Sequence, residues 1–247
     1  MRFPFLLQLL SVALFAALWE AAALAADSRL LPGPAAVLGV LGQGLGDGEL
    51  PYHVAITLAR VAASFVIAMV VGTAIGIAMG RLKTLDRVLD SWLVLFLNIP
   101  ALVTIILAYV WFGLIEAAAI AAVAVNKIPI VVVILREGAR ALERDYLEMA
   151  AVFRLGRWRL LRHVVLPQLF PFLVTAARTG LALVWKIVLV VELLGRGYGV
   201  GFQLYLSFQL FDITTVLAYT IAFIAVIQAI ELGLLQPLER RAARWRR

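Results

Sequence analysis

The sequence of 247 residues contains no cysteine and only two histidines, His53 and His163. The absence of cysteine excludes disulfide frameworks, thiol catalysis, iron–sulfur clusters and cysteine-based zinc sites. Because the two histidines lie far apart in the sequence, we expect no histidine-based metal site either. The sequence also lacks a nucleophile elbow, a paired-carboxylate motif and a Walker motif, so nothing in it indicates an enzyme.

Charged residues are scarce and apolar residues are in large excess. Charged residues make up 15% of the chain and hydrophobic residues 64%, against about 25% and about 45–50% in soluble domains. Such an excess can only be hidden in lipid, and the apolar runs are continuous, which excludes transmembrane β-strands. A helical span needs about 20 apolar residues. Six windows qualify: 5–26, 54–80, 89–113, 116–135, 166–194 and 213–235. We therefore expect an all-α, polytopic membrane protein with about six transmembrane helices.

The first window has two interpretations. Arg2, an apolar stretch and the small residues of 22–26 are typical of a cleavable signal peptide. The window is longer than the usual core of such a peptide, and it contains Trp19 and Glu20. We favour a retained helix, and the topology of the later spans is the same in both cases.

The distribution of basic residues predicts the orientation. With residue 1 inside, the inner segments hold 16 of the 22 Lys and Arg residues, whereas the outer loops hold only Arg29 and Arg196. This asymmetry follows the positive-inside rule and explains the net charge of +7 without a nucleic-acid partner. We expect a multi-pass membrane protein with both termini in the cytoplasm. The inner segments are 1–4, 81–88, 136–163 and 236–247.

The loop 136–163 is the only long charged stretch between spans. Leu147, Ala151 and Trp158 recur near helical spacing, which predicts short amphipathic helices on the membrane surface. One interpretation is a surface helix whose arginines bind anionic lipid headgroups. The other is a docking element for a partner protein.

Motifs in this loop and elsewhere support the docking interpretation. Glu148-Met149-Ala150 and Trp158, followed by Leu166-Pro167, resemble the EAA loop of ATP-binding-cassette (ABC) importer permeases. Further matching segments occur in the same order over about three quarters of the chain, and they most resemble the nitrate/sulfonate/taurine/bicarbonate branch. These segments are 57–61 with Gly72 and Gly76, then 98–100, 111–113, 129–130 and 192–201.

The resemblance implies a transporter that is built from several chains with different functions. Two copies of this chain would enclose the translocation path, two cytoplasmic ATPase subunits would dock on 148–156, and a periplasmic binding protein would deliver the solute. ATP and Mg²⁺ would be bound by the ATPase, and this chain would bind no cofactor. The residues implied in coupling are Glu148, Met149, Ala150, Arg154 and Gly156. The sequence departs from the family at Arg154, where the loop glycine is expected, so the turn is either replaced there or moved to Gly156.

Polar residues beside prolines occur within two of the apolar windows. Asn98 and Pro100 lie in one window, and Asn126 and Lys127 precede Pro129 in the next. We expect both helices to be interrupted, and interrupted helices at membrane depth often line a substrate path. The alternative is that the prolines only kink the helices and that Lys127 pairs with a carboxylate or a carbonyl group.

The fifth window and the loop after it complete the candidate residues. Arg178 and Lys186 lie eight residues apart on roughly one helical face, where they either line an anion path or pair with carboxylates. We expect the glycine-rich segment 195–201 to be a flexible or a tightly turned outer loop. By resemblance it lies near the periplasmic gate, with Glu192, Gly195, Gly199 and Gly201. Gly72, Gly76 and Gly80 recur every four residues, which favours close helix packing.

The resemblance therefore implies a permease subunit of an ATP-driven, binding-protein-dependent importer for a small anionic solute, in the bacterial inner membrane. A stand-alone secondary carrier or channel is the alternative, and an integral-membrane enzyme lacks the necessary polar residues. The expected organisation is an N-terminal helix and periplasmic loop (1–53), a permease core of about five helices (54–239) and a basic cytoplasmic tail (240–247).

Overall fold

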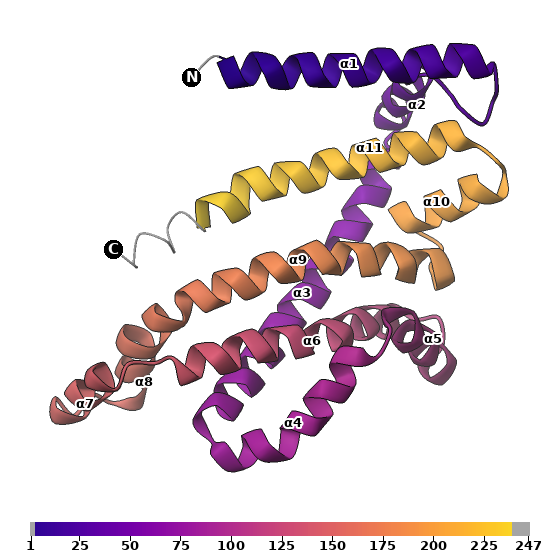
Figure 1. Ribbon diagram of the computed structural model, residues 1–247. Coiled ribbons are helices and arrows are strands. Elements are labelled where there is room, and N and C mark those ends of the chain that lie inside the picture. The colour runs from indigo at the N-terminus through magenta and orange to yellow at the C-terminus, as the bar shows by residue number, and fades with distance from the viewer. Residues whose placement is uncertain (1–2, 239–247) are drawn as a thin grey trace. The chain divides into compact units, whose positions relative to one another are not determined.

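The computed structural model describes residues 3–238, apart from the side chains of residues 3–6, 8 and 9 (Figure 1). The described chain is helical throughout and contains no strand, as expected. Its elements are α1 (Phe3–Ala26), α2 (Pro34–Gly46), α3 (Glu49–Arg81), α4 (Lys83–Asn98), α5 (Ala101–Phe112), α6 (Glu116–Arg140), α7 (Arg144–Val152), α8 (Arg157–Leu160), the π-helix η1 (Leu161–Val165), α9 (Leu166–Gly195), α10 (Val200–Gln209), α11 (Ile213–Ile230) and the π-helix η2 (Glu231–Leu235).

The described residues form two compact units. One unit contains the chain up to Thr57 together with Glu192–Ile227, and the other contains Leu58–Val191 and the chain from Gln228 onward. Each unit is described by itself below. The basic tail expected over 240–247 lies outside the described residues.

Long apolar helices account for the expected spans. Four helical runs are long and apolar enough to cross a membrane, and α4 with α5 form a fifth candidate as a bent pair. The window 5–26 corresponds to α1, which is apolar over Leu10–Ala26. Among the described residues, the last five windows thus correspond to candidate spans, whereas α1 is a shorter apolar helix and the apolar helix α2 was expected as a loop. The four long runs are Glu49–Arg81, Glu116–Arg140, Arg157–Gly195 and Ile213–Leu238.

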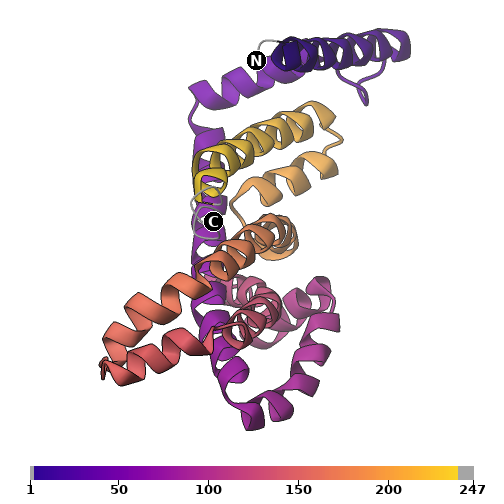
Figure 2. The same cartoon turned by 60° about the vertical axis from the view of Figure 1, so that its left-hand side comes forward.

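The window 89–113 is not one straight helix, which corrects the expectation from hydropathy. α4 ends at Asn98 and α5 begins at Ala101, and the two axes differ by 96° (Figures 1 and 2). Pro100 explains the break, because a proline disfavours helical backbone at the residue before it. Ile99 is accordingly extended, with φ −72° and ψ 121°.

The second expected interruption does not occur. α6 continues through Pro129 from Glu116 to Arg140, so the prediction of a broken helix at 126–129 was wrong. A proline within a helix forfeits one backbone hydrogen bond, and neighbouring helices can hold the helix together. Pro129 is buried among such neighbours, whereas Pro100 is exposed. Pro167 lies in the first turn of α9, directly after the widened turn of η1, within a helical run that begins at Arg157.

The glycine stripe of α3 packs directly against α6. A Cβ atom placed on Gly72 would lie 2.6 Å from the Cβ of Val131, and one on Gly80 would lie 2.6 Å from the Cβ of Ala139. Between them, a Cβ on Gly76 would lie 2.8 Å from the carbonyl oxygen of Val132. Real Cβ atoms essentially never lie this close to other atoms. The two backbones can therefore approach each other this closely only because the three residues are glycines. This confirms the packing role expected from their spacing.

Replacement of Gly76 by alanine should destabilise the protein by about 1–3 kcal/mol, because the added methyl group would meet backbone atoms of α6. The measurement is the free energy of unfolding in mixed detergent and SDS micelles. Ala74 lies on the exposed side of the same helix, and Ala74→Leu is the matched control, with an expected change within about 0.5 kcal/mol. Equal losses in both variants would contradict the proposed close contact.

Candidate functional site

The loop 136–163 folds into a helical hairpin. α7 runs out from α6, and α8 with η1 runs back beside it into α9 (Figures 1 and 2). Within the motif Glu148-Met149-Ala150, Glu148 and Met149 are exposed, whereas Ala150 is buried. The alanine therefore serves packing within the hairpin, and the two preceding side chains are accessible to a partner.

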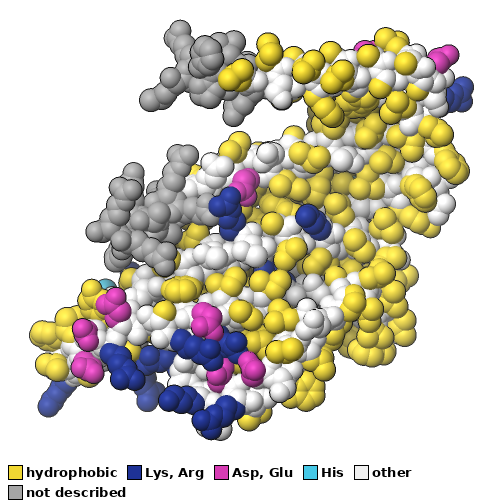
Figure 3. Space-filling view, in the orientation of Figure 1, with side chains coloured by type: hydrophobic (Ala, Val, Ile, Leu, Met, Phe, Trp, Pro, Cys, Tyr) yellow, Lys and Arg dark blue, Asp and Glu magenta, His cyan; other side chains and the backbone are white. Residues whose placement is uncertain are grey.

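The hairpin exposes several large apolar side chains. The most exposed is Val152, with 80% of its surface accessible. Exposed residues of this kind on the turn-forming end of a hairpin are typical of an interaction surface. Figure 3 shows Lys and Arg side chains gathered with acidic ones around the hairpin and over α4. The exposed apolar side chains are Tyr146, Met149, Val152, Phe153 and Trp158.

Arg154 itself forms the turn that ends α7. Its φ of +48° lies in the left-handed region, where glycine is preferred. The amide of Arg154 donates to the carbonyl of Ala151, and the amide of Leu155 donates to the carbonyl of Ala150, each at 3.0 Å. These two bonds make a Schellman motif. The turn therefore stays at the position of the family's glycine. It does not move to Gly156, which has φ −60°.

Of the six residues expected to line a path, the four beside prolines are divided between two places. Asn98 and Pro100 are exposed at the break between α4 and α5, and Asn98 donates to the carbonyl of Val94 at 2.7 Å. Asn126 is half-buried and Lys127 is buried in α6. No hydrogen bond in the described chain links the two pairs.

Lys127 is a fully buried cation. Its exposed fraction is 1%, and Nζ has no hydrogen-bond partner among the described residues. Gly180 of α9 provides the space for the side chain, since a Cβ on that residue would lie 2.8 Å from Nζ. A buried ammonium group without an acceptor is costly, so its presence in an apolar helix indicates a function. The pairing considered as an alternative is not found within the described residues.

The other intramembrane cations have carboxylate neighbours or exposed positions. Arg178 Nη2 lies 3.3 Å from Glu231 Oε1, which supports the pairing alternative for this residue. Arg60 makes a two-point contact with Glu116, at 2.5 Å and 3.3 Å. Lys186 is exposed on α9. The sequence contains both acidic partners, but nothing in its local pattern predicts these long-range pairs.

Glu192 organises the outer turn of the other unit. Its side chain is fully buried and accepts hydrogen bonds from the hydroxyl of Thr57 at 2.9 Å and the amide of Gly201 at 2.8 Å. Gly201 lies in the first turn of α10, where the helix dipole favours a negative charge. The amide of Val200 donates to the Thr57 hydroxyl at 2.8 Å. The carboxylate is therefore satisfied by the start of a helix.

Two of the glycines expected in this loop are tied to Glu192. Gly199 precedes α10 with φ +118°, a conformation that is nearly restricted to glycine. A Cβ on Gly199 would also overlap the Glu192 carboxylate, at 2.5 Å from Oε2. Gly201 contributes its amide, and Gly195 ends α9. The loop is thus a tight turn rather than a flexible one.

His53, which the sequence did not single out, completes this network. The amide of Gly199 donates to its Nδ1 at 3.0 Å, so Nδ1 must carry a lone pair. The neutral ring then bears its proton on Nε2, which lies 2.8 Å from the side-chain amide of Gln203. The nearest atom of Gln203 is its Nε2, so a hydrogen bond with the ring forms only when the side-chain amide is turned to present its oxygen. Thr57 and His53 lie far from Glu192 in sequence, which explains why spacing did not reveal them.

Within the described residues, no group of three or more His, Asp or Glu side chains could hold a metal ion. The polar groups are instead distributed among the hairpin over 136–163, a buried lysine and a turn anchored by Glu192.

Comparison with known proteins identifies the family. Residues 68–234 match the family described as binding-protein-dependent transport system inner membrane component. The chain belongs to this family. It is thus the permease component of an ABC transporter, is not itself catalytic, and is a multi-pass inner-membrane protein, as the EAA-like loop indicated.

Curated relatives place this permease in the branch expected from its motifs. It is 31% identical to the taurine transport system permease protein TauC of Escherichia coli over 92% of this chain and 84% of that protein. It is 28% identical to the putative aliphatic sulfonates transport permease protein SsuC of Bacillus subtilis, over 89% and 79%. The bicarbonate transport system permease protein CmpB of Synechococcus elongatus is 29% identical over 66% and 59%.

Solved structures support the fold. An inward-facing structure of the MetNI methionine ABC transporter matches with a TM-score of 0.65 at 18% identity, over 75% of this permease and 92% of that chain. An amino acid ABC transporter crystallised with histidines matches with a TM-score of 0.64 at 20% identity, over 81% and 97%.

Substitution of Gly199 by alanine should destabilise the outer turn by about 2 kcal/mol or more, because the residue would be strained and its methyl group would displace Glu192. Gly197→Ala is the matched control, since a Cβ there meets no atom within 4 Å. Protease resistance of the purified permease in detergent measures the effect. If both variants resist proteolysis equally, the turn does not depend on Glu192 in the way described.

Proposed function

We propose that α7 is the element through which a cytoplasmic ATPase drives this permease, and that two copies of the chain enclose the translocation path. Each copy binds one ATPase subunit at Glu148–Gly156 and receives solute from a periplasmic binding protein. Both termini face the cytoplasm. Closure of the ATPase subunits on ATP moves the two hairpins together and switches access to the path as a rigid-body change.

The observation that carries this proposal is the exposed surface of α7. Met149 and Phe153 lie one turn apart on the helix, and Val152 beside them is almost fully accessible. Apolar side chains that are exposed to water on a charged hairpin raise the free energy of the protein unless a partner covers them. The Schellman turn at Arg154 fixes the end of the helix, so a force applied to α7 passes to α6 and α9 rather than bending the loop.

Charge reversal at Glu148, or a charge at Val152, should prevent the ATPase from binding. Glu148→Arg and Val152→Asp each change an exposed side chain, so the permease itself should stay folded. Each tagged variant is co-expressed with the ATPase from its own operon, purified in mild detergent and assayed for ATP hydrolysis. We expect at least a tenfold loss of co-purified ATPase activity, equivalent to about 1.4 kcal/mol of binding free energy.

Asp47→Arg is the matched control, because Asp47 is exposed on the loop expected at the opposite side of the membrane. Its co-purified activity should equal that of the wild type. Retention of full ATPase activity by Glu148→Arg and Val152→Asp would overturn the docking role of α7.

We also propose that the solute is a small anion of the sulfonate or carboxylate class and that Lys127 attracts it. The relatives are named for taurine, aliphatic sulfonates and bicarbonate, which all carry an acidic oxyanion group. Lys127 supports the same chemistry, because its ammonium group lies in an apolar helix without an acceptor in the described chain. In a medium of low dielectric constant such a charge attracts an anion far more strongly than in water.

Replacement of Lys127 by methionine separates a transport role from a structural one. Removing an uncompensated buried charge should leave the permease at least as stable as the wild type. Uptake of taurine, ethanesulfonate or bicarbonate into proteoliposomes with the cognate ATPase and binding protein should fall at least tenfold for the transported anion. Arg29→Met removes an exposed cation that the sequence did not place on the path and should change uptake less than threefold. Normal uptake by Lys127→Met would refute the anion role.

A further inference from the structure

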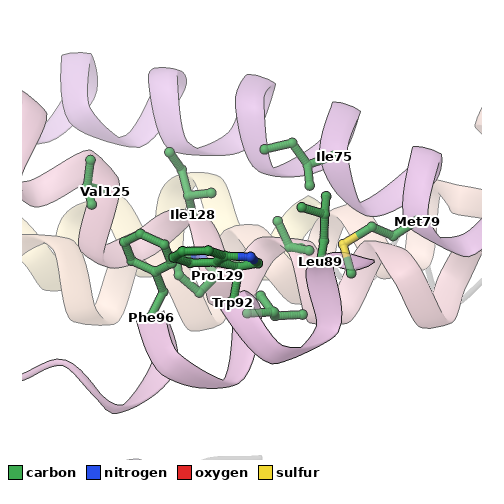
Figure 4. A pocket seen from close by; sticks show the side chains of 10 residues that line it. Ile75, Met79, Leu89, Trp92, Phe96, Val125, Ile128 and Pro129 are labelled. Atoms are coloured by element: carbon green, nitrogen blue, oxygen red, sulfur yellow. The ribbon is translucent and has the colours of Figure 1, made fainter. Parts of the chain in front are cut away.

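An apolar pocket lies between α3, α4 and α6, within one unit of the protein. Its volume is about 280 Å³, and all ten lining side chains are apolar (Figure 4). Trp92 and Phe96 project from α4, Ile75 and Met79 reach in from α3, and Pro129 lies on α6. None of the polar residues expected to form a solute path lines this pocket. Its chemistry therefore suits a hydrocarbon chain rather than a small anion.

A second hollow adjoins the first at Met79, which lines both. Its volume is about 400 Å³, and it is lined by Met79, Gly80, Lys83, Asp86, Arg87 and Arg140. It thus presents three cations and one anion beside the corner where α3 ends and α4 begins. Residues 81–88 form one of the inner segments expected from the distribution of positive charge.

The charges of the second hollow are unequally paired. Asp86 is held by Arg140 at 2.5 Å and by Arg136 at 3.4 Å. Lys83 and Arg87 are exposed and form no ion pair with any residue in the described part of the chain. The single acidic residue is therefore occupied by two other arginines, and two cations stay available for an anionic ligand.

We infer that these two hollows together bind one anionic phospholipid, with its phosphate group at Lys83 and Arg87 and one acyl chain along Trp92 and Phe96. An apolar slot that ends in a pair of available cations matches a molecule with an apolar tail and a negative head. A free phosphate ion would use only the second hollow. The bound lipid fills the space between α4 and α6 next to the bend at Pro100, so it supports the orientation of α4.

The test measures quenching of Trp92 fluorescence by bromine atoms on lipid acyl chains. The full-length permease is placed in nanodiscs that contain increasing mole fractions of brominated phosphatidylglycerol or brominated phosphatidylcholine. The signal of Trp92 is the difference between wild type and Trp92→Phe. We expect phosphatidylglycerol to reach half-maximal quenching at a mole fraction about tenfold lower than phosphatidylcholine does. Inorganic phosphate at 10 mM, the alternative source of the same group, should not shift that value.

The double variant Lys83→Gln/Arg87→Gln should remove the preference for phosphatidylglycerol. Arg157→Gln/Arg159→Gln is the matched control, because it removes two exposed cations from α8, outside the pocket, and should retain the preference. An equal loss of this preference in both double variants would show that the cations are attracted to a negatively charged membrane surface in general. That result would overturn the proposed site. Absence of Trp92 quenching by either lipid would show that protein fills the pocket, which also overturns it.

Discussion

The close approach of α3 to α6 is the contact on which the larger unit depends. Helices in lipid gain little from the hydrophobic effect, so they associate through tight packing and internal polar contacts. The stripe of Gly72, Gly76 and Gly80 supplies the packing. Along the same pair of helices, Arg60 binds Glu116, and the Ser64 hydroxyl donates to the carbonyl of Ile120 at 3.3 Å.

The position of α6 then determines much of what the permease can do. α6 carries Lys127 at its middle and leads into the docking hairpin at its end. Near that end, Arg136 binds Asp90 of α4 at 2.6 Å, which connects α4 to the same helix. The hairpin, α4 and α3 are therefore all joined to α6, and α3 is joined to it through the glycine stripe.

Two fully buried charges in the protein have opposite environments. Glu192 has a hydroxyl donor, a backbone amide donor and the start of α10 around its carboxylate. A buried carboxylate with these hydrogen-bond donors is a structural element that holds a turn in place. Lys127 has no acceptor among the described residues. Burial alone thus does not distinguish these two charges, whereas the set of partners does.

The sequence was sufficient for the helices and insufficient for their interactions. Hydropathy located the apolar segments, because each helix that crosses the membrane must be apolar along its own length to be stable in lipid. The same proline signal, however, marks a 96° bend at Pro100 and an unbroken helix at Pro129. The difference lies in burial among other helices, which local sequence does not encode. Likewise, Glu116 and Glu231 became partners of Arg60 and Arg178 only through the fold.

Arg154 shows that the geometry of the docking turn matters more than the residue that forms it. A non-glycine residue in the left-handed region costs about 1–2 kcal/mol, and this turn nonetheless stays where the family has glycine. The two backbone bonds from Arg154 and Leu155 satisfy the last carbonyls of α7, which would otherwise be unpaired. Moving the turn to Gly156 would relieve the strain, but it would lengthen α7 and rotate its exposed face. The strained arginine therefore fixes the length of α7, and with it the position of the exposed side chains at the end of this helix.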